Sequence, residues 1–432
     1  MNLVLNQEQL VIADNFFEFL LSNEKELIIC GPGGVGKTYL MGYLIDKVLP
    51  QYHDTCKMLG IPTVYKEVVM TAMTNQAAEV LAEASQKSTQ TIHSYLNLIV
   101  KDNYTTGETN LVKTSKWDIK HNIILFIDEC SMMDYKLLKL LRESVVNCKI
   151  VFVGDAYQLP PIKETVSNIY QENLPYFELT QQMRNNNKEG ITKLCQQTRA
   201  TIQSGIFKDI PVGLAGSHYL EAEQAEKEII THFEHNQHNS IILTYTNNSA
   251  INYNQYIQEL RGNTLPYTVG EFLVSNSTVE LLHQRINTQQ ILKVLAVSQP
   301  EEFVVDESTS LPVYYLTLEG TYGSIYKRVP VPMNTTYFTQ LVKYYKKQAK
   351  WIPYFKLKNT IADLRQTDAS TVHKAQGSTY NNVFIDLNDL GTCKVPNQFS
   401  RLLYVAISRA RDNIFFFGSL PKKYGEIIWS KT

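Results

Sequence analysis

The sequence predicts an α/β fold in which short buried strands alternate with helices. Apolar runs of strand length end abruptly in polar residues at three places: ELIIC before GPGGVGKT, NIILFI before DEC, and VFV before GDAYQLPP. Strands that are interleaved with helices in this way form parallel sheets. The carboxyl ends of parallel strands line one crevice, and ligands bind there. We therefore expect the functional residues at these strand ends.

Length and composition restrict the classes of protein to which this chain can belong. A chain of 432 residues is too long for one compact core, so we expect about two to four domains. With 44% hydrophobic and 19% charged residues, and no apolar run long enough to cross a membrane, it is expected to be globular. Its 6 cysteines lack CxxC spacing, which favours a reducing cytoplasm. The net charge of −1 gives by itself no reason to propose a nucleic-acid partner.

The strongest local pattern is a phosphate-binding loop. GPGGVGKT matches GxxxxGK[ST] and stands between an apolar strand and a helix that we expect to end at Pro50. Lys37 would bridge the β- and γ-phosphates of ATP, and the Thr38 hydroxyl would ligate Mg²⁺. Backbone N–H groups at the helix N-terminus would wrap the β-phosphate. The residues expected to contact the nucleotide are Gly31, Pro32, Gly33, Gly34, Val35, Gly36, Lys37, Thr38 and Tyr39.

A pair of carboxylates follows the second strand. Asp128 would hold the Mg²⁺ shell, while Glu129 would orient and deprotonate the attacking water. Seen alone, the pair also fits a strand end with two solvated acids, which is the less favoured interpretation. An aspartate without the glutamate would suit a kinase, whereas the pair favours an NTPase.

Gln158 follows the third strand end, within GDAYQLPP. In a doubly wound sheet this position faces the ligand crevice, where an uncharged amide would sense the γ-phosphate. Pro160 and Pro161 would stiffen the loop, so that it passes movement to whatever it touches. Taken alone, the stretch reads as an ordinary β-turn.

The order of these motifs resembles that of superfamily 1B helicases, the branch that includes RecD and the Dda-type phage helicases. The resemblance runs from end to end, although residues 265 to 366 carry almost none of it. The matching segments are LNQEQ (5–9), the phosphate loop, TAMTNQAAEVL (71–81), TIHSYL (91–96), DECSM, GDAYQLPP, LTQQMRNN (179–186), TYTNNSAINYN (244–254), STVHKAQGST (370–379) and LLYVAISRAR (402–411).

The resemblance implies further site residues. Gln9 would read adenine, Gly377 would bind the nucleotide, and Arg184 and Arg409 would stabilise charge on the γ-phosphate from across a cleft between domains. Each of these arginines alone is more often a surface ion-pair residue. Residues that would contact nucleic acid are Thr71, Thr74, Thr91, His93, Tyr104, Thr246, Asn247, Thr371, His373 and Lys374.

The expected architecture is two RecA-like P-loop NTPase domains with one insertion in each. Residues 1–178 form the first, domain 1A, and 96–117 are inserted in it as a β-hairpin, domain 1B. In the family this hairpin is the pin that splits the duplex. Tyr104 near its tip would stack on a base or pack against its own hairpin. Domain 2A combines residues 179–264 and 367–432, and 265–366 form an inserted domain 2B.

Domain 2B is rich in tyrosine and β-branched residues, which suits a small antiparallel barrel, and the resemblance implies an SH3-like one. The stretch 335–355 reads as one amphipathic basic helix. Its Lys343, Lys346, Lys347 and Lys350 would bind a phosphate backbone or would form a solvated face.

The predicted function is an ATP-dependent DNA helicase that moves along single-stranded DNA in replication, recombination or repair. Direction 5′ to 3′ is implied by the resemblance alone. The open alternatives are a translocase that strips proteins from DNA, a P-loop phosphotransferase and, least favoured, a binding module without hydrolysis. Expected partners are single-stranded DNA, single/double-strand junctions and a single-strand-binding protein or recombinase, with no membrane. We expect a monomer in the cytoplasm, that of the host if the chain is phage-encoded.

Overall fold

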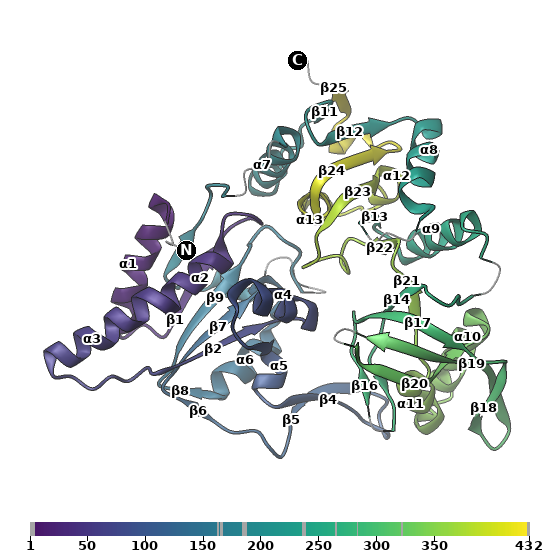
Figure 1. Cartoon of the computed structure of the whole chain (residues 1–432), viewed down its shortest axis with the longest axis horizontal. Coiled ribbons are helices and arrows are strands. Elements are labelled where there is room, and N and C mark those ends of the chain that lie inside the picture. The colour runs from purple at the N-terminus through teal and green to yellow at the C-terminus, as the bar shows by residue number, and fades with distance from the viewer. Residues whose placement is uncertain are drawn as a thin grey trace.

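The computed structural model describes residues 5–161, 164, 167–183, 188–235, 239–263, 266–282, 284–320 and 323–429. Figure 1 shows three bodies: the N-terminal α/β domain, a second α/β domain that carries the C-terminus, and a third body built from the middle of the chain. Within the described ranges, no helix is long and apolar enough to cross a membrane.

Domain 1A is built on a six-stranded parallel sheet in the order β10-β1-β9-β7-β2-β3. Each strand leads into a loop or helix at the same edge of the sheet. Its strands are β1 Glu26–Cys30, β2 Glu67–Ala72, β3 Thr89–Thr91, β7 Ile123–Asp128, β9 Lys149–Gly154 and β10 Tyr176–Glu178. Its helices are α1 Gln7–Leu21, α2 Lys37–Tyr43, α3 Leu49–Leu59, α4 Asn75–Ser85, α5 Ile92–Tyr95 and α6 Tyr135–Glu143.

The helix after the phosphate loop does not end at Pro50, and that prediction was wrong. A π-helical turn, Leu44–Val48, joins α2 to α3, and Pro50 lies in the first turn of α3. Proline is tolerated in a first turn, because the N–H it lacks has no obligatory partner there. The helical run therefore continues to Leu59, where Gly60 in the left-handed region ends it.

Domain 2A is a five-stranded parallel sheet in the order β12-β24-β23-β13-β22. Two separate segments of the chain build this one sheet, as the split-domain prediction requires. Its strands are β12 Ser217–Leu220, β13 Ser240–Thr244, β22 Ala369–Thr371, β23 Tyr380–Asp386 and β24 Ala410–Phe417. Its helices are α7 Glu189–Ser204, α8 Ala222–Phe233, α9 Asn247–Leu260, α12 Leu387–Leu390 and α13 Pro396–Ser408, and a small pair joins β11 Ile210–Val212 to β25 Ile427–Trp429. The predicted α/β fold with two parallel-sheet domains is confirmed.

One domain boundary differs from the prediction at 178/179. The Leu179 N–H donates to Cys30 O over 2.8 Å, and the Met183 N–H donates to Gly34 O over 3.0 Å. Residues 179–183 therefore pack on domain 1A. The first element of domain 2A is α7, which begins at Glu189.

The inserted 2B segment forms an antiparallel sheet, and its SH3-like character stays a prediction. Two helices lie against the sheet where one helix, 335–355, was expected, so that prediction was wrong. The chain turns at Ala349, whose φ is +51°, and this turn lets both Tyr345 and Phe355 be buried. The elements are β14 Phe272–Ser275, β15 Val279–Glu280, β16 Arg285–Ile286, β17 Ile291–Val297, β18 Glu301–Asp306, β19 Thr309–Gly320, β20 Ile325–Pro332, α10 Thr335–Lys347, α11 Trp351–Thr360 and β21 Leu364–Gln366.

A β-hairpin leaves domain 1A and reaches domain 2B (Figure 1). Its strands are β4 Leu98–Asp102 and β5 Thr109–Lys113, and the Gly107 N–H donates to Asn103 O over 2.8 Å to close the turn. Gly107 has a φ of +74°, a conformation that glycine adopts without strain. After the hairpin in the chain, β6 Lys120–His121 pairs with β8 Val145–Val146.

A buried lysine ties α1 to the first sheet. Lys149, at the start of β9, is 2% exposed, and its ammonium donates to Phe19 O (2.6 Å), Ser22 O (2.9 Å) and Glu24 O (2.5 Å). Burial lowers the pKa of Lys149 to about 8, so the ammonium is still mostly charged at neutral pH. One side chain thus bonds three carbonyls in the last turn of α1 and just beyond it.

We expect Lys149→Met to lower the free energy of unfolding by about 1–3 kcal/mol, because buried carbonyls lose their donor. Denaturant unfolding monitored by circular dichroism measures this change. Lys25→Met is the matched control, since Lys25 is exposed just before β1. Equal stability of the two variants would contradict the assigned role of Lys149.

Candidate nucleotide and nucleic-acid sites

The phosphate loop is shaped as an anion site before any ligand binds. Gly34 and Gly36 have φ of +85° and +83°, and α2 begins at Lys37 directly after them. The Lys37 ammonium donates to Gly31 O (2.7 Å) and Pro32 O (3.0 Å). In this conformation the loop carbonyls hold the ammonium close to the free N–H groups at the start of α2.

The sheet order brings the three predicted strand ends together. Because β1, β9 and β7 are neighbours in the sheet, the loops that carry Lys37, Gln158 and Asp128 emerge side by side. The predicted grouping of these loops at one sheet edge follows directly from this order.

Asp128 and Glu129 form a partly buried acidic pair at the end of β7. Burial, with a smaller contribution from the neighbouring Glu129 carboxylate, raises the pKa of Asp128, and the Lys37 ammonium acts against the rise. Glu129 has a φ of +55°, an uncommon conformation for a side chain other than glycine. Its Oε2 atom is buried and without a hydrogen-bond partner among the described residues. Strain and an unsatisfied oxygen at one residue mark a site that is built for a ligand or a water.

The Gln9 side chain links the phosphate loop to the start of α1 through hydrogen bonds. Its Nε2 donates to Val35 O over 3.2 Å, and its Oε1 accepts from the backbone N–H of Asn6, which caps α1. Gln9 is 0% exposed. The predicted contact with adenine stays a prediction, but the structure adds that Gln9 couples the start of α1 to the loop.

The segment before Arg184 lies against the outside of the phosphate loop. The Glu8 carboxylate accepts from the Thr180 N–H (2.7 Å), the Thr180 hydroxyl (2.5 Å) and the Gln181 N–H (3.0 Å). The Gln182 side chain donates to Gly33 O over 3.2 Å. Arg184 itself lies outside the described residues, so its predicted role is untested.

Side chains of domain 2A form hydrogen bonds to the loop that follows β9. The Arg401 guanidinium, from α13, donates to Ala156 O (2.7 Å) and Gln158 O (2.8 Å). Gln376, within the VHKAQG segment, donates to the Gln158 side-chain oxygen over 3.0 Å. Gln158, predicted to sense the γ-phosphate, is 5% exposed and bonded to the other domain.

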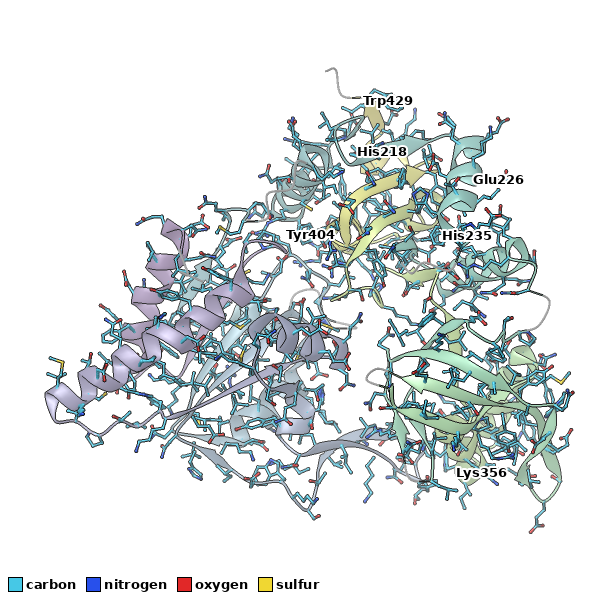
Figure 2. The ribbon with its side chains drawn as sticks, viewed as in Figure 1. His218, Glu226, His235, Lys356, Tyr404 and Trp429 are labelled. Carbon is cyan, nitrogen blue, oxygen red and sulfur yellow. The ribbon has the colours of Figure 1, made fainter. Side chains whose placement is uncertain are left out.

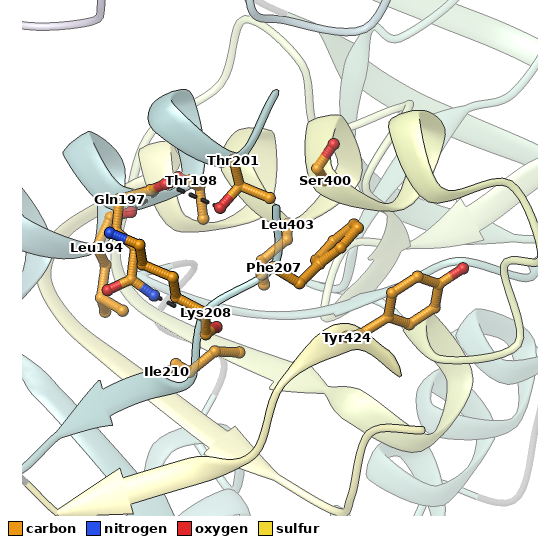
Figure 3. Close-up of a pocket in the computed structure, with 10 residues that line it drawn as sticks. All are labelled: Leu194, Gln197, Thr198, Thr201, Phe207, Lys208, Ile210, Ser400, Leu403 and Tyr424. Atoms are coloured by element: carbon orange, nitrogen blue, oxygen red, sulfur yellow. Dashed lines mark hydrogen bonds between the residues drawn. The ribbon is translucent and has the colours of Figure 1, made fainter. Parts of the chain in front are cut away.

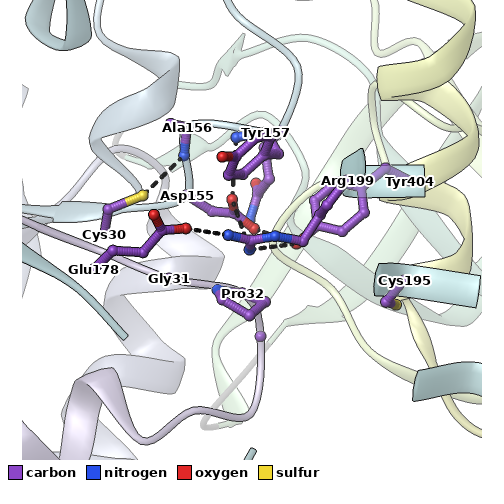
Figure 4. Close-up of polar contacts among 12 residues, drawn as sticks. Cys30, Gly31, Pro32, Asp155, Ala156, Tyr157, Glu178, Cys195, Arg199 and Tyr404 are labelled. Carbon is purple, nitrogen blue, oxygen red and sulfur yellow. Dashed lines mark hydrogen bonds and ion pairs between the residues drawn. The ribbon is translucent and has the colours of Figure 1, made fainter. Parts of the chain in front are cut away.

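Asp155 is the centre of the contact between the two parallel-sheet domains (Figure 4). The Tyr404 hydroxyl donates to its Oδ2 over 2.5 Å, and the Arg199 guanidinium lies 3.7 Å from its Oδ1. Arg199 also pairs with Glu178 and lies over the Tyr157 ring, 4.1 Å from the centroid. Figure 2 shows Tyr404 on the side of domain 2A that faces domain 1A. Sequence reasoning missed Arg199, Arg401 and Tyr404, since the partners of each are about 200 or more residues away or across a domain boundary.

Arg409 lies at the end of α13 and is 6% exposed. Its guanidinium donates to Val405 O (3.2 Å) and Ser378 O (3.0 Å), both in domain 2A. Gly377 has a φ of +88°, and no atom lies within 4 Å of where a Cβ would stand. The predicted nucleotide contacts of these two residues stay predictions.

Three predicted nucleic-acid residues are helix N-caps at strand ends. Thr74, Thr91 and Thr246 accept hydrogen bonds from the Ala77, Ser94 and Ser249 N–H groups. Backbone N–H groups at such helix starts suit phosphate oxygens, since they carry partial positive charge.

The side chains of two other predicted nucleic-acid residues, Thr71 and Thr371, are buried. Thr71 is 0% exposed and its hydroxyl donates to Phe126 O over 2.9 Å, so its side chain is a core residue that links β2 to β7. Thr371 is 5% exposed, and its carbonyl accepts from the Lys374 and Ala375 N–H groups. Neither side chain offers a surface to a nucleic acid.

His373 and Lys374 lie where domain 2A meets domain 2B. The Lys374 ammonium donates to Asn276 Oδ1 (2.5 Å) and to Asn247 Oδ1 (3.4 Å). Burial lowers the pKa of His373, and that of His93 in domain 1A, so both imidazoles are neutral at physiological pH. Because Lys374 donates to Asn276 and to Asn247, an exposed residue at the start of α9, these three side chains form one polar surface between the two domains.

Asp389 supports the TYTNNS loop and was missed by the sequence reasoning. Its carboxylate accepts from the Tyr245 N–H (2.5 Å), the Thr246 N–H (2.8 Å), the Thr246 hydroxyl (2.7 Å) and the Ser249 hydroxyl (2.8 Å). This residue of α12 therefore fixes the loop that carries Thr246 and Asn247.

The hairpin tip is held by α11 of domain 2B. The Tyr104 ring is 54% exposed and meets the Phe355 ring edge-on, with centroids 5.0 Å apart. A Cβ on Gly107 would stand 2.2 Å from the Trp351 ring, so the glycine is what lets the ring lie against the turn. Asn359 donates to Asp102 over 2.8 Å. Tyr104 packs against another domain, where packing against its own hairpin had been the alternative.

A small cavity of about 10 Å³ lies inside domain 2A, between α7 and α13 (Figure 3). Leu194, Thr198 and Leu403 line it. This volume holds about one water molecule, so the cavity is not a nucleotide site.

Comparisons with known proteins agree with this geometry. The AAA domain family matches residues 19–164, and the UvrD-like helicase C-terminal domain matches residues 367–416. The ATP-dependent DNA helicase dda of Enterobacteria phage T4 is 24% identical, over 93% of this chain and 97% of the relative. The uncharacterized protein R530 of Acanthamoeba polyphaga mimivirus is 22% identical over 96% of this chain and 99% of that protein.

A solved structure shares the fold. It is the crystal structure of Pif1 helicase from Bacteroides in complex with ADP-AlF3 and ssDNA, with a TM-score of 0.53 and 15% identity over 98% of this chain and 95% of that chain. The resemblance to superfamily 1B helicases is confirmed by these matches together.

The Glu8 contacts predict a pH dependence. Burial acts to raise the pKa of Glu8, but hydrogen bonds from Thr180 and Gln181 outweigh it and hold the pKa below its ordinary value. The folded state therefore binds fewer protons than the unfolded state near the ordinary pKa of about 4.3, and stability rises with pH through that window. The stabilisation is present above the unfolded pKa and is lost as pH falls through the folded pKa.

We expect Glu8→Gln to flatten the dependence of the unfolding free energy on pH over this acidic range. Glu18→Gln, an acid of the same helix for which the structure gives no comparable contact, serves as the control. If both variants follow the wild-type profile, Glu8 does not hold the segment before Arg184.

Proposed function

We propose that this protein is an ATP-dependent DNA helicase that moves along single-stranded DNA. One observation carries the proposal: the loop after β9, beside the phosphate loop, is held by domain 2A through Arg401, Gln376 and Tyr404. A nucleotide at the phosphate loop would therefore act on the contact between domains, which is what a motor requires.

The site fits ATP with Mg²⁺. Asp128 and Glu129 are partly buried at the end of β7, and the Lys37 ammonium is close enough to counter the rise in the pKa of Asp128 that burial causes. Thr38, at the start of α2, and Asp128 would hold the metal ion, which when bound neutralises phosphate charge. The Bacteroides relative was solved with ADP-AlF3, which supports nucleotide use here.

Roles for the remaining residues follow from their positions. Lys37 would leave the loop carbonyls and bind the β- and γ-phosphates. Glu129, whose Oε2 has no partner among the described residues, would accept a hydrogen bond from the attacking water and take its proton. Arg184 and Arg409 would stabilise the developing charge on the γ-phosphate.

Coupling between nucleotide and strand follows from Gln158. Its amide is bonded to Gln376, two residues after Lys374 in the VHKAQG segment. If Gln158 turns to the γ-phosphate, the bond to Gln376 is exchanged, and the VHKAQG segment is free to move. Each cycle of closing and opening would shift one domain along the strand, held by contacts worth about 1–3 kcal/mol per base.

The relatives support DNA as the partner. The phage T4 protein is a DNA helicase and the Bacteroides Pif1 helicase was solved with ssDNA. We extend the proposal to 5′-to-3′ movement, to single/double-strand junctions, to a role in replication, recombination or repair, and to action as a cytoplasmic monomer. A single-strand-binding protein or recombinase as loading partner belongs to the same proposal.

The hairpin favours unwinding over protein removal alone. Its tip is braced by Trp351 and Phe355, so it would resist the force of an advancing duplex. A translocase that unwinds poorly has no need of such a brace. A small-molecule phosphotransferase is disfavoured by the second parallel-sheet domain, whose residues bond the loop after β9.

Steady-state ATP hydrolysis with and without single-stranded DNA tests the proposal. We expect strong stimulation by DNA in the wild type and none above background in Lys37→Ala. Gln158→Ala should keep DNA binding but lose most of the stimulation, because the link to Gln376 is gone. Gln51→Ala, an exposed glutamine of α3, should behave as the wild type. Hydrolysis that is indifferent to DNA would refute the motor.

Strand displacement tests the hairpin. Phe355→Ala removes the ring against which Tyr104 packs, so we expect unwinding to fall several-fold while DNA-stimulated hydrolysis is kept. Tyr135→Ala, which removes a tyrosine that is 65% exposed on domain 1A, is the control. Unchanged unwinding in Phe355→Ala would show that the packing of Tyr104 on Phe355 is not needed for strand separation, whereas a wild type that hydrolyses ATP with DNA but does not unwind would favour the translocase.

A further inference from the structure

One segment of domain 2B differs in charge from the rest of the chain. The whole protein has a net charge of −1, but residues 320–362 contain no aspartate or glutamate. The same segment carries eight basic residues: Lys327, Arg328, Lys343, Lys346, Lys347, Lys350, Lys356 and Lys358. This segment includes β20, α10 and α11.

Four of these lysines share one side of α10 and its end. Lys343, Lys346 and Lys347 lie on one face of α10, Lys350 follows in the turn before α11, and all four are exposed. The opposite side of α10 is fixed to the sheet by Leu341 (8% exposed) and Tyr345 (1%). The lysine face is therefore held outward by the packing of its own helix.

These four ammonium groups have no acidic partners in the part of the chain that the structure describes. Exposed lysines elsewhere do form ion pairs, at Lys113 and Lys193, and so do the partly buried Lys87 and Lys120. Tyr344, 49% exposed, stands among the four lysines. Unpaired like charges so close together repel one another, and a polyanion relieves that repulsion.

The lysine face begins at the hairpin tip. Lys350 immediately precedes Trp351, whose ring lies against Gly107 at the turn. The Lys350 N–H donates to Tyr345 O over 3.0 Å, so the turn between α10 and α11 is fixed. Positive charge thus runs from the tip of the hairpin out along α10.

We propose that this face, Lys343, Lys346, Lys347 and Lys350, binds phosphates of the DNA duplex just ahead of the hairpin. The proposal rests on the proposed helicase function, because it takes the hairpin tip as the point where the strands part. Lys343 and Lys347 are four residues apart in α10, which at helical rise is roughly 6 Å, and Lys350 extends the face beyond the end of the helix. Phosphates of one strand lie about 3.4 Å apart along its axis, so the helical part of the face would meet about two phosphates and Lys350 one more.

The site would hold the duplex without reading its sequence. Lysine ammonium groups act as point charges on phosphate oxygens, and such contacts carry no base information. Holding the duplex at the tip would press the junction against the hairpin at each step. An acidic segment of a partner protein would also suit the charge, but the continuity with the hairpin tip favours DNA.

The test is the salt dependence of DNA binding by the full chain. The variant Lys343→Gln/Lys346→Gln/Lys347→Gln/Lys350→Gln is compared with Lys57→Gln/Lys66→Gln/Lys227→Gln/Lys422→Gln, which makes the same charge change at exposed lysines elsewhere. Fluorescence anisotropy measures affinity for a single strand and for the same strand with a duplex attached. A third substrate adds a displaced-strand tail.

For the duplex-bearing substrate, the proposal predicts that the slope of log K against log[salt] becomes shallower by about 3 in the first variant. Each lost phosphate contact accounts for about 0.9 of this change. The single strand should keep its slope, and the displaced tail should add nothing to the difference. The control variant should keep both slopes. Both variants should keep DNA-stimulated hydrolysis of ATP. If the wild type itself shows no stimulation by DNA, the proposed helicase function is refuted, not the role of the lysine face.

Equal slopes for the two variants on the duplex would overturn the proposal. A loss that appears only with the displaced tail would assign the face to the single strand and overturn it as well. The proposal is also overturned if the first variant keeps its binding to DNA and loses binding only to an acidic peptide such as poly-glutamate. The double variant Lys346→Glu/Lys347→Glu, expected to weaken duplex binding further, checks the result independently of the four-fold change.

Discussion

Domain 2A is anchored on the nucleotide side of domain 1A through one buried carboxylate, Asp155. Because β9 lies between β1 and β7, the loop that carries Asp155 emerges beside both the phosphate loop and Asp128. The Tyr404 hydroxyl and the Arg199 guanidinium approach it from domain 2A. A carboxylate that is 1% exposed needs such partners, since a buried charge without them is costly. Closing and opening of the domains must therefore keep or exchange these contacts.

The positions of the other functional residues follow from that anchor. Arg401 holds the backbone of the same loop, and Gln376 reaches the Gln158 side chain, so the VHKAQG segment is tied to the loop beside the phosphate site. Through Lys374 and Asn276 the connection continues to domain 2B, and through α11 to the hairpin tip. A change at the γ-phosphate thus has a continuous chain of packed and bonded residues along which to act.

Much of this was predictable from local sequence. Apolar runs that end in GPGGVGKT, DEC and GDAYQ gave the strand ends, and parallel-sheet topology brought them together. The helix after the phosphate loop was misjudged at Pro50, because a π-helical turn places that proline in a first helical turn. The single helix 335–355 was misjudged because burial of both Tyr345 and Phe355 requires a turn that no local pattern shows.

The residues that sequence reasoning missed share one property: their roles depend on distant partners. Asp389 is a plain acid in a short helix until the TYTNNS loop is folded against it, about 140 positions away in the chain. Thr71 shows the converse, since its motif suggested a nucleic-acid contact while its hydroxyl satisfies a carbonyl of the next strand. In a chain whose sites are assembled from two domains, motif order identifies the reaction, whereas burial and pairing across the domains decide which member of each motif meets the ligand.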